Sequence, residues 1–312
     1  MPLDPQAKRF LTMVAATSTQ DRSRPGPEAR RQAFARLMQF ARADVAVVSG
    51  VDGVMPGPAG DLAYRLYAPS DITGERSPGF VFFHGGGMVA GSIETHDPIA
   101  GALAQTTGCR LVSVDYRLAP EHKFPAAVED AIVATRWVSQ QAVSLGIDAA
   151  RLVVGGDSAG ATLAAVVCQE SLRSAGPAIA AQILICPVLD FEDTSPSRDA
   201  FAEDPLLDRL TLEADLADYL LEGADLADPR ISPLRATKFA GLPPAIIHTA
   251  EFDPMRDEGN AYAGKLIAAG VTVDHVCHEG MIHNFHAIGA ILPQGRSVLH
   301  QIGEQVRRAI GG

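Results

Sequence analysis

One serine of the chain has the surroundings of a nucleophile. Residues 156–160 read Gly-Asp-Ser-Ala-Gly, so Ser158 sits in a G-x-S-x-G pattern. In that pattern the serine lies on a sharp turn from a strand into a helix, and its oxygen is exposed for attack on a carbonyl carbon. The apolar run 151–154 before it and the small residues 160–165 after it predict such a strand and helix. The helix would also aim its first N–H groups at the site.

A nucleophilic serine needs a base, because its free hydroxyl is almost fully protonated at neutral pH. Three of the nine histidines, His278, His283 and His286, follow an apolar segment, 271–277, that predicts a strand. Loops at the carboxyl ends of parallel strands hold the active sites of open α/β sheets. His278 would end the strand and His286 would lie in the helix or turn beyond it. His283 lies between them, so the pattern favours His283 as the base.

A carboxylate must hold the imidazole in the right tautomer and stabilise the imidazolium. Asp253 follows the predicted strand 244–249, and the proline after it favours an extended backbone. Glu251 and Asp257 are alternatives for the same role. The chain order serine, aspartate, histidine is that of α/β hydrolases and differs from the order in chymotrypsin-like and subtilisin-like proteases.

A glycine loop follows another predicted strand, 79–83. Its residues are His84, Gly85, Gly86 and Gly87. Glycines let backbone N–H groups approach a developing oxyanion, and the N–H of Ala159, next to the nucleophile, would add a further donor. His84 precedes the glycines at a strand end, so we expect it to hold the loop by hydrogen bonding.

A dinucleotide-binding turn is a rival interpretation of the same loop. Gly85, Gly87 and Ala90 fit G-x-G-x-x-A, and Asp115 ends the next predicted strand. The spacing to Asp115 is long for that motif, and the interpretation leaves the serine and histidine motifs unexplained.

Apolar strands alternate with helices along most of the chain. This alternation predicts an α/β fold with a mostly parallel sheet covered by helices on both faces. We expect strands at residues 62–67, 79–83, 110–114, 151–154, 179–186, 244–249 and 271–277. We expect helices at residues 126–141, 160–175, 260–269 and 293–310.

Two stretches depart from this alternation. Residues 1–47 are predicted to be helical, with Phe34, Leu37, Met38 and Ala41 at helical spacing. Residues 191–237 contain no apolar strand run and hold twelve Asp or Glu against four Arg. We interpret this stretch as helices inserted over the sheet; an ordinary solvated helix pair is the alternative. The predicted organisation is 1–47 cap, 48–190 core, 191–237 cap insertion and 238–312 core.

Composition excludes several classes of partner. The chain has 312 residues and a formal net charge of -11, so an acidic surface would repel nucleic acid. No run approaches the roughly 18 apolar residues of a spanning helix, and the first ten residues lack the apolar region of a signal peptide. Four scattered cysteines predict reduced thiols. We therefore expect a cytoplasmic protein that binds neither membranes nor nucleic acid.

With these motifs in place, the chain resembles the bacterial hormone-sensitive-lipase-like esterases, often called family IV. The resemblance spans residues 62–285. It also rests on the segments 114–121, Val-Asp-Tyr-Arg-Leu-Ala-Pro-Glu, 253–258, Asp-Pro-Met-Arg-Asp-Glu, and 280–283, Gly-Met-Ile-His. The Gly-Asp-Ser-Ala-Gly form is similar to the larger subgroup with that sequence.

The resemblance implies an α/β-hydrolase fold with a helical cap, and a serine esterase for short- to medium-chain carboxylic esters. It implies the triad Ser158, Asp253 and His283, an oxyanion hole with Gly86 as its main loop donor, and no metal or organic cofactor. Homodimers are common in the family, although no interface is evident in this sequence. The other residues that it marks are Arg117 and Glu121, as buried structural ions beside the site, and Met88, Asp157 and Asn284, as residues of the substrate region.

Two departures from the family pattern bear on specificity. Met88 stands where an aromatic residue is common, and Asn284 stands where a glycine is common. Two other functions remain open at this point. A non-catalytic receptor of the gibberellin-receptor type lacks the catalytic histidine, which this chain has at His283. An amidase or a lactonase would use the same triad, so the motifs do not separate them from an esterase.

Overall fold

Within the part of the chain that the computed structural model describes, eight strands form one sheet, in the order β1-β2-β4-β3-β5-β6-β7-β8. The structure describes residues 2–17, 26–41, 48, 50–70, 74, 76–192 and 194–311. β1 pairs antiparallel with β2, and β2 pairs antiparallel with β4. The six strands from β4 to β8 in the sheet order run parallel. The predicted mostly parallel sheet is confirmed.

The strands are β1 Gly50–Gly57, β2 Gly60–Tyr67, β3 Ser77–Phe83, β4 Arg110–Val114, β5 Ile147–Asp157, β6 Ala181–Ile185, β7 Ala245–Phe252 and β8 Val273–Ile282. The α-helices are α1 Pro5–Thr17, α2 Pro27–Ala41, α3 Ile93–Thr107, α4 Ala126–Gln140, α5 Ala159–Ser174, α6 Pro196–Ala200, α7 Arg209–Tyr219, α8 Arg256–Ala268 and α9 Pro293–Ala309. Two short 3-10 helices are η1 Pro233–Arg235 and η2 Phe285–Ala287.

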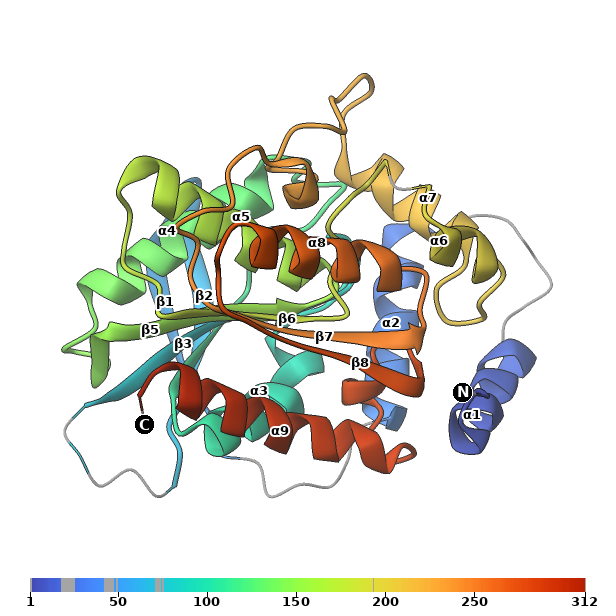
Figure 1. The fold of residues 1–312 in the computed structure, drawn as a ribbon, viewed down its shortest axis with the longest axis horizontal. Helices are drawn as coiled ribbons and strands as arrows, with labels where there is room; N and C mark the ends of the chain where they lie inside the picture. Colours follow the sequence, from blue (N-terminus) through green and yellow to red (C-terminus); the bar gives the residue numbers. More distant parts are fainter. Residues whose placement is uncertain are drawn as a thin grey trace.

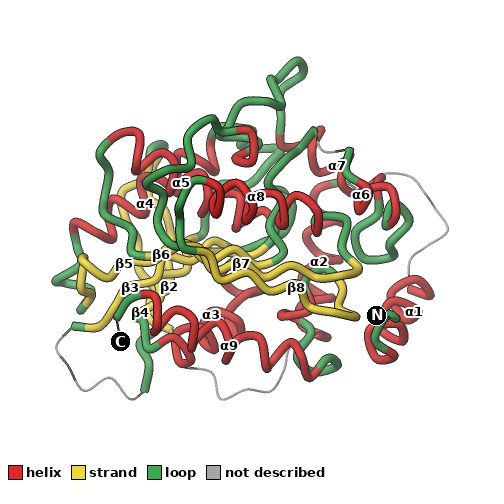
Figure 2. Tube along the Cα trace, viewed as in Figure 1, coloured by secondary structure: helices red, strands yellow, loops and turns green. Residues whose placement is uncertain are grey.

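Helices cover both faces of the sheet. α4, α5 and α8 lie on one face, and α3 and α9 lie on the other (Figure 1). The strands therefore form the middle of three layers (Figure 2). The central strands are apolar because they are buried on both sides; the side chains of residues 80–83 in β3, for example, are all 0% exposed. None of the described helices has both the length and the apolar character that a membrane span requires.

Both stretches that interrupt the alternation contain helices. α1 and α2 lie in the first, and α6, α7 and η1 lie in the second. α2, α6 and α7 gather at the end of the sheet toward which β7 and β8 point (Figure 1). Arg30 of α2 and Asp215 of α7 form an ion pair at 3.0 Å, which joins the two stretches. In the stretch 1–47, which was predicted to be helical, α2 ends at Ala41. Residues 18–25 and 42–47 of this stretch lie outside the described part. The division into core and cap stays a prediction.

Several predicted boundaries were wrong. β5 runs to Asp157, the residue before the serine, and β8 runs to Ile282, the residue before His283. β1 and α3 were not predicted at all. α3 contains Pro98, which breaks the usual helical pattern, although Ser92 and Thr95 form a capping box at its start.

Candidate active site

Ser158 occupies a strained turn between β5 and α5. Its backbone has φ 51 and ψ -118, a region that residues other than glycine rarely adopt. A Cβ at Gly156 or at Gly160 would overlap the carbonyl oxygen of Phe83 in β3. The two glycines are therefore needed because the turn presses against the neighbouring strand, and not only because it is sharp. This geometry matches the predicted strand–turn–helix.

The three predicted side chains meet although they are far apart in sequence. His283 Nε2 lies 3.1 Å from Ser158 Oγ, and His283 Nδ1 lies 2.8 Å from Asp253 Oδ2. The other carboxylate oxygen of Asp253 accepts a hydrogen bond of 2.8 Å from the backbone N–H of Met255. Ser158 is 6% exposed, His283 3% and Asp253 0%, so the chain of hydrogen bonds is shielded from water.

Parallel pairing brings these residues together. β5, β6, β7 and β8 are consecutive neighbours in the sheet, and each pair is parallel. Ser158 follows β5, Asp253 follows β7 and His283 follows β8, so all three leave the sheet at the same edge.

The alternative residues have other partners. The carboxylate of Glu251 accepts the backbone N–H of Gly280, and the carboxylate of Asp257 binds Arg256 and the N–H of Ser197. His278 lies inside β8, and its Nε2 is 2.7 Å from His248 Nδ1. The site geometry therefore selects Asp253 and His283 from the sets that the sequence left open.

The carboxylate of Asp253 acts on the ionisation of His283. Burial by itself would lower the pKa of His283, but the charge and the hydrogen bond of Asp253 outweigh burial and raise it. Because the imidazolium is stabilised, the ring is suited to take a proton from Ser158.

The glycine loop packs against the turn of the serine, since a Cβ at Gly160 would overlap the carbonyl oxygen of His84. Among the described residues no hydrogen-bond acceptor is found for the N–H groups of Gly86, Gly87 or Ala159. The N–H of Gly85, by contrast, is donated to Asp157 Oδ1 at 3.1 Å. Gly85 was predicted as an oxyanion donor, and that prediction was wrong because its N–H is already used.

The dinucleotide interpretation of this loop is also wrong. A Cβ at Gly87 would overlap the carboxylate of Asp215 from α7. A pyrophosphate drawn up to this loop would therefore meet a negative charge. Asp115 is exposed at the end of β4, and its backbone N–H is bound to Ala63.

Two of the predicted substrate-region residues are buried in the core. Asp157 is 0% exposed, and its carboxylate faces Gly85 and two histidines, so its assignment to substrate binding was wrong. Met88 is 1% exposed and packs in the core that contains α4 and α5. Asn284 is partly buried and has φ 56, a conformation that asparagine tolerates better than most residues. Substrate contacts of Met88 and Asn284 stay predictions.

The predicted structural residues differ in their placement. His84 Nδ1 is 2.9 Å from Gly85 O, and burial lowers the pKa of His84 to about 3, so it is neutral in the loop. Arg117 binds the fully buried Asp130 at 2.7 Å. Glu121 was predicted to be buried, which was wrong. Its side chain is 54% exposed, and it pairs with Arg31 of α2 at the surface.

Two residues close to the triad were not predicted. Cys186 follows β6, and its thiol lies close to Asp253 and His283. One possible metal-binding atom from each of the three residues lies within 4.8 Å of the other two. Two of these three residues already bind each other through the 2.8 Å hydrogen bond, and a metal ion would have to break it. Asp204, in the loop between α6 and α7, also acts on the pKa of His283 through its charge. No local motif marks either residue, because the fold alone places them there.

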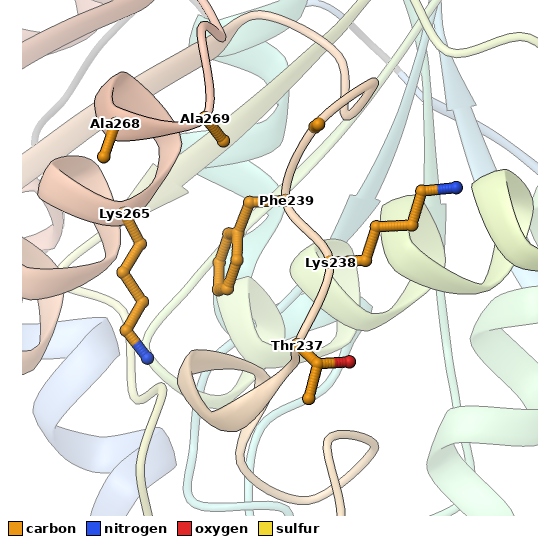
Figure 3. A pocket seen from close by; sticks show the side chains of 7 residues that line it. Thr237, Lys238, Phe239, Lys265, Ala268 and Ala269 are labelled. Atoms are coloured by element: carbon orange, nitrogen blue, oxygen red, sulfur yellow. The ribbon is translucent and has the colours of Figure 1, made fainter.

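A pocket elsewhere on the surface contains none of the predicted residues. It lies between α8 and the segment that precedes β7 (Figure 3). The Lys265 Nζ lies 5.6 Å from the centre of the Phe239 ring and donates to the carbonyl of Leu234. The lysine is therefore occupied by contacts within the protein.

Comparisons with known proteins agree with this architecture. A family model described as the alpha/beta hydrolase fold matches residues 80–287. Carboxylesterase NlhH of Mycobacterium tuberculosis is 40% identical over 248 residues, which cover 78% of this chain and 76% of that protein. Ethyl acetate hydrolase of Pseudomonas putida is 38% identical over 251 residues, which cover 79% of this chain and 78% of that protein.

A solved structure extends the likeness to nearly the whole chain. Ester-hydrolase EH1AB1 from the metagenome of Lake Arreo, in complex with a bipyridine phosphonate derivative, has 40% sequence identity and a TM-score of 0.94, with 99% of this chain and 100% of that chain covered. The chain therefore belongs to the α/β-hydrolase family, in its hormone-sensitive-lipase-like branch.

Proposed function

We propose that this protein is a serine carboxylesterase in which Ser158 is the nucleophile, His283 the base and Asp253 the residue that orients the base. As a member of its family it is a carboxylic ester hydrolase. The roles of the three residues rest on one observation. A single imidazole lies 3.1 Å from the hydroxyl on one side and 2.8 Å from a buried carboxylate on the other.

In the first step, Ser158 Oγ attacks the ester carbonyl carbon while its proton passes to His283 Nε2. The carbonyl oxygen becomes an oxyanion, and we assign its stabilisation to the N–H groups of Gly86, Gly87 and Ala159, for which no acceptor is found among the described residues. The C–O bond to the alcohol then breaks, and His283 gives its proton to the departing oxygen. The product of this step is an ester between the acyl group and Ser158.

In the second step, water attacks the acyl-enzyme. His283 takes a proton from the water and returns it to Ser158 Oγ as the bond to the serine breaks. The carboxylic acid leaves and the free hydroxyl is restored. No step of this sequence requires a metal or an organic cofactor, since the protein supplies the nucleophile, the base and the donors.

We propose substrates with short to medium acyl chains. Ser158 is 6% exposed, and this burial favours small acyl groups. A relative is named for hydrolysis of ethyl acetate. Rates on an ester series from acetate to palmitate, measured beside an amide and a lactone, test the proposed substrate class.

The nucleophile is tested by Ser158→Ala, with the exposed Ser144→Ala as a matched control. We expect Ser158→Ala to lower the turnover of p-nitrophenyl butyrate by at least about three orders of magnitude. A fluorophosphonate probe should label the parent protein and Ser144→Ala but not Ser158→Ala. Unchanged turnover in folded Ser158→Ala refutes the assignment, and an unlabelled parent protein favours a binding protein over an enzyme.

We further propose a cytoplasmic location and no nucleic-acid partner. The four cysteines form no disulfide, and the net charge of -11 supports the absence of nucleic-acid binding. A homodimer remains an expectation from the family, and sedimentation of the purified protein tests it.

A further inference from the structure

A buried polar cluster surrounds the carboxylate of Asp157, the residue before the nucleophile. Asp157 Oδ2 lies 3.4 Å from His96 Nε2, of α3, and 3.6 Å from His286 Nε2, of η2. All three side chains are buried, at no more than 1% exposure. Within the described part of the chain, Asp157 Oδ2 and both Nε2 atoms are buried without a hydrogen bond, so the contacts between them are electrostatic. The two imidazoles therefore have Asp157 as their electrostatic partner.

Asp157 is held in its charged form. Burial by itself would raise the pKa of this carboxyl, but the imidazoles of His96 and His286 outweigh burial and lower it well below its usual range. A buried carboxylate is costly unless nearby donors compensate it. Oδ1 receives the N–H of Gly85, and Oδ2 is left to the imidazoles. Loss of one imidazole would leave the charge only partly compensated.

His286 joins two segments that carry catalytic side chains. It lies three residues after His283, and its partner Asp157 lies next to Ser158. Between His283 and His286, the backbone of Asn284 adopts the left-handed conformation with φ 56. The hydrogen bond that His283 Nδ1 donates to Asp253 fixes how the ring of His283 is oriented. The contact from His286 to Asp157 instead constrains how far the histidine loop stands from the nucleophile turn.

We propose that His286 is a positioning residue, which acts through the buried carboxylate of Asp157 to hold the loop of His283 in register with the turn of Ser158. The inference rests on the proposed esterase function and adds a residue to its machinery. His286 touches no reacting atom. Its effect is on the geometry of the proton transfer and on the charge that His283 experiences, because Asp157 is among the groups that raise the pKa of His283.

The pH behaviour depends on all ionisable groups around both histidines. Those that act on His283 are Asp253, Asp157 and Asp204. Around His286 lie Asp157, His278 and, at the pocket between α3 and α9, Arg296 and His300. His96 completes the cluster from α3, and the ring of His84 stacks on it with ring centres 5.3 Å apart.

Two variants separate the donor from the bulk of the side chain. His286→Phe keeps a buried ring and removes the N–H group, and we expect kcat to fall by about tenfold with KM little changed. The acid limb of its pH–kcat/KM profile should shift to higher pH, because Asp157 is less compensated and acts more strongly on His283. His286→Gln restores an N–H donor and should keep kcat within about threefold of the parent protein.

His278→Gln is the matched control. His278 is a histidine on the strand that leads to the same loop, but its ring binds His248 and not Asp157. We expect this variant to keep the parent kcat, because the contact from His286 to Asp157 stays in place. Thermal unfolding of all variants shows whether a loss of rate follows a loss of stability.

If folded His286→Phe keeps the kcat and the pH profile of the parent protein, the proposal is overturned. Equal losses in His286→Phe and His286→Gln would also overturn it, because they would show a packing role. If His286→Phe does not fold, 15N–1H NMR of the parent protein decides, with the signal assigned by its loss in His286→Gln. A proton on His286 Nε2 supports the contact, and an unprotonated Nε2 overturns it. Failure of the proposed function is distinguishable, since the parent protein would then not be labelled by a fluorophosphonate.

Discussion

The exchange Asp253→Asn tests whether the carboxylate sets the tautomer of the base. Asp253 Oδ1 accepts the backbone N–H of Met255 at 2.8 Å, and Oδ2 faces His283 Nδ1 at 2.8 Å. In the asparagine variant the amide oxygen should keep the bond to Met255, because the N–H there can only donate. The amide NH2 is then forced toward His283 Nδ1.

This arrangement would put the wrong tautomer in the site. Nδ1 must accept a hydrogen bond from the amide, so the ring proton moves to Nε2, which then cannot accept the proton of Ser158. The expected loss of kcat is about four orders of magnitude, by comparison with removal of the same charge in other triads. At about 1.4 kcal/mol for each factor of ten, this loss corresponds to about 5.5 kcal/mol of transition-state stabilisation.

The assay is turnover of p-nitrophenyl butyrate across a pH series, with Asp257→Asn as the control. Asp257 follows the same strand but binds Arg256 and Ser197, so its variant should keep nearly the parent rate. In Asp253→Asn the charge that raises the pKa of His283 is gone and burial is no longer outweighed, so any residual activity should persist to lower pH. Retention of more than about a tenth of the parent rate in folded Asp253→Asn would refute the tautomer argument.

Three further predictions follow from the structure. Gly160→Ala should cost about 3 kcal/mol of stability or prevent folding, since its Cβ would overlap a backbone oxygen of β3. Gly264→Ala in α8 has open space around the new Cβ and should add about 0.5 to 1 kcal/mol of stability. Thermal unfolding of both variants checks that the two changes in stability have opposite signs. Arg117→Ala should lower the free energy of unfolding in urea by about 3 kcal/mol, because it leaves the buried Asp130 without its cation. Arg173→Ala removes a mostly exposed partner of Glu170 and should lower it by well under about 1 kcal/mol. Similar losses in the two variants would contradict the argument from burial. The acid limb of kcat/KM in the parent protein should lie above the ordinary histidine value, since Asp253 raises the pKa of His283 and only the neutral ring accepts a proton; a limb below that value would contradict this reading of the pair.

The parts of the fold that the sequence predicted are those with strong local signals. Buried parallel strands are apolar throughout, so β3, β4 and β5 were found from runs of valine, leucine and phenylalanine. α3 was missed because Pro98 and three threonines weaken its helical pattern, and tertiary packing against α9 stabilises it instead. β8 was predicted to end too early, because His278, Glu279 and Gly280 carry no apolar strand signal, although the strand continues to Ile282 beside β7.

The sequence by itself determined the chemistry, because the glycine-flanked serine, the glycine loop and the histidine after the last strand are local patterns with local physical causes. It left open which carboxylate serves His283 and which loop N–H groups are free. Those choices depend on hydrogen bonds between residues far apart in the chain, such as Asp253 with Met255 and His283, or Gly85 with Asp157. The cluster of Asp157, His96 and His286 was decided by the tertiary structure alone, since only the packing of α3 and η2 against the end of β5 brings a buried charge and two imidazoles together.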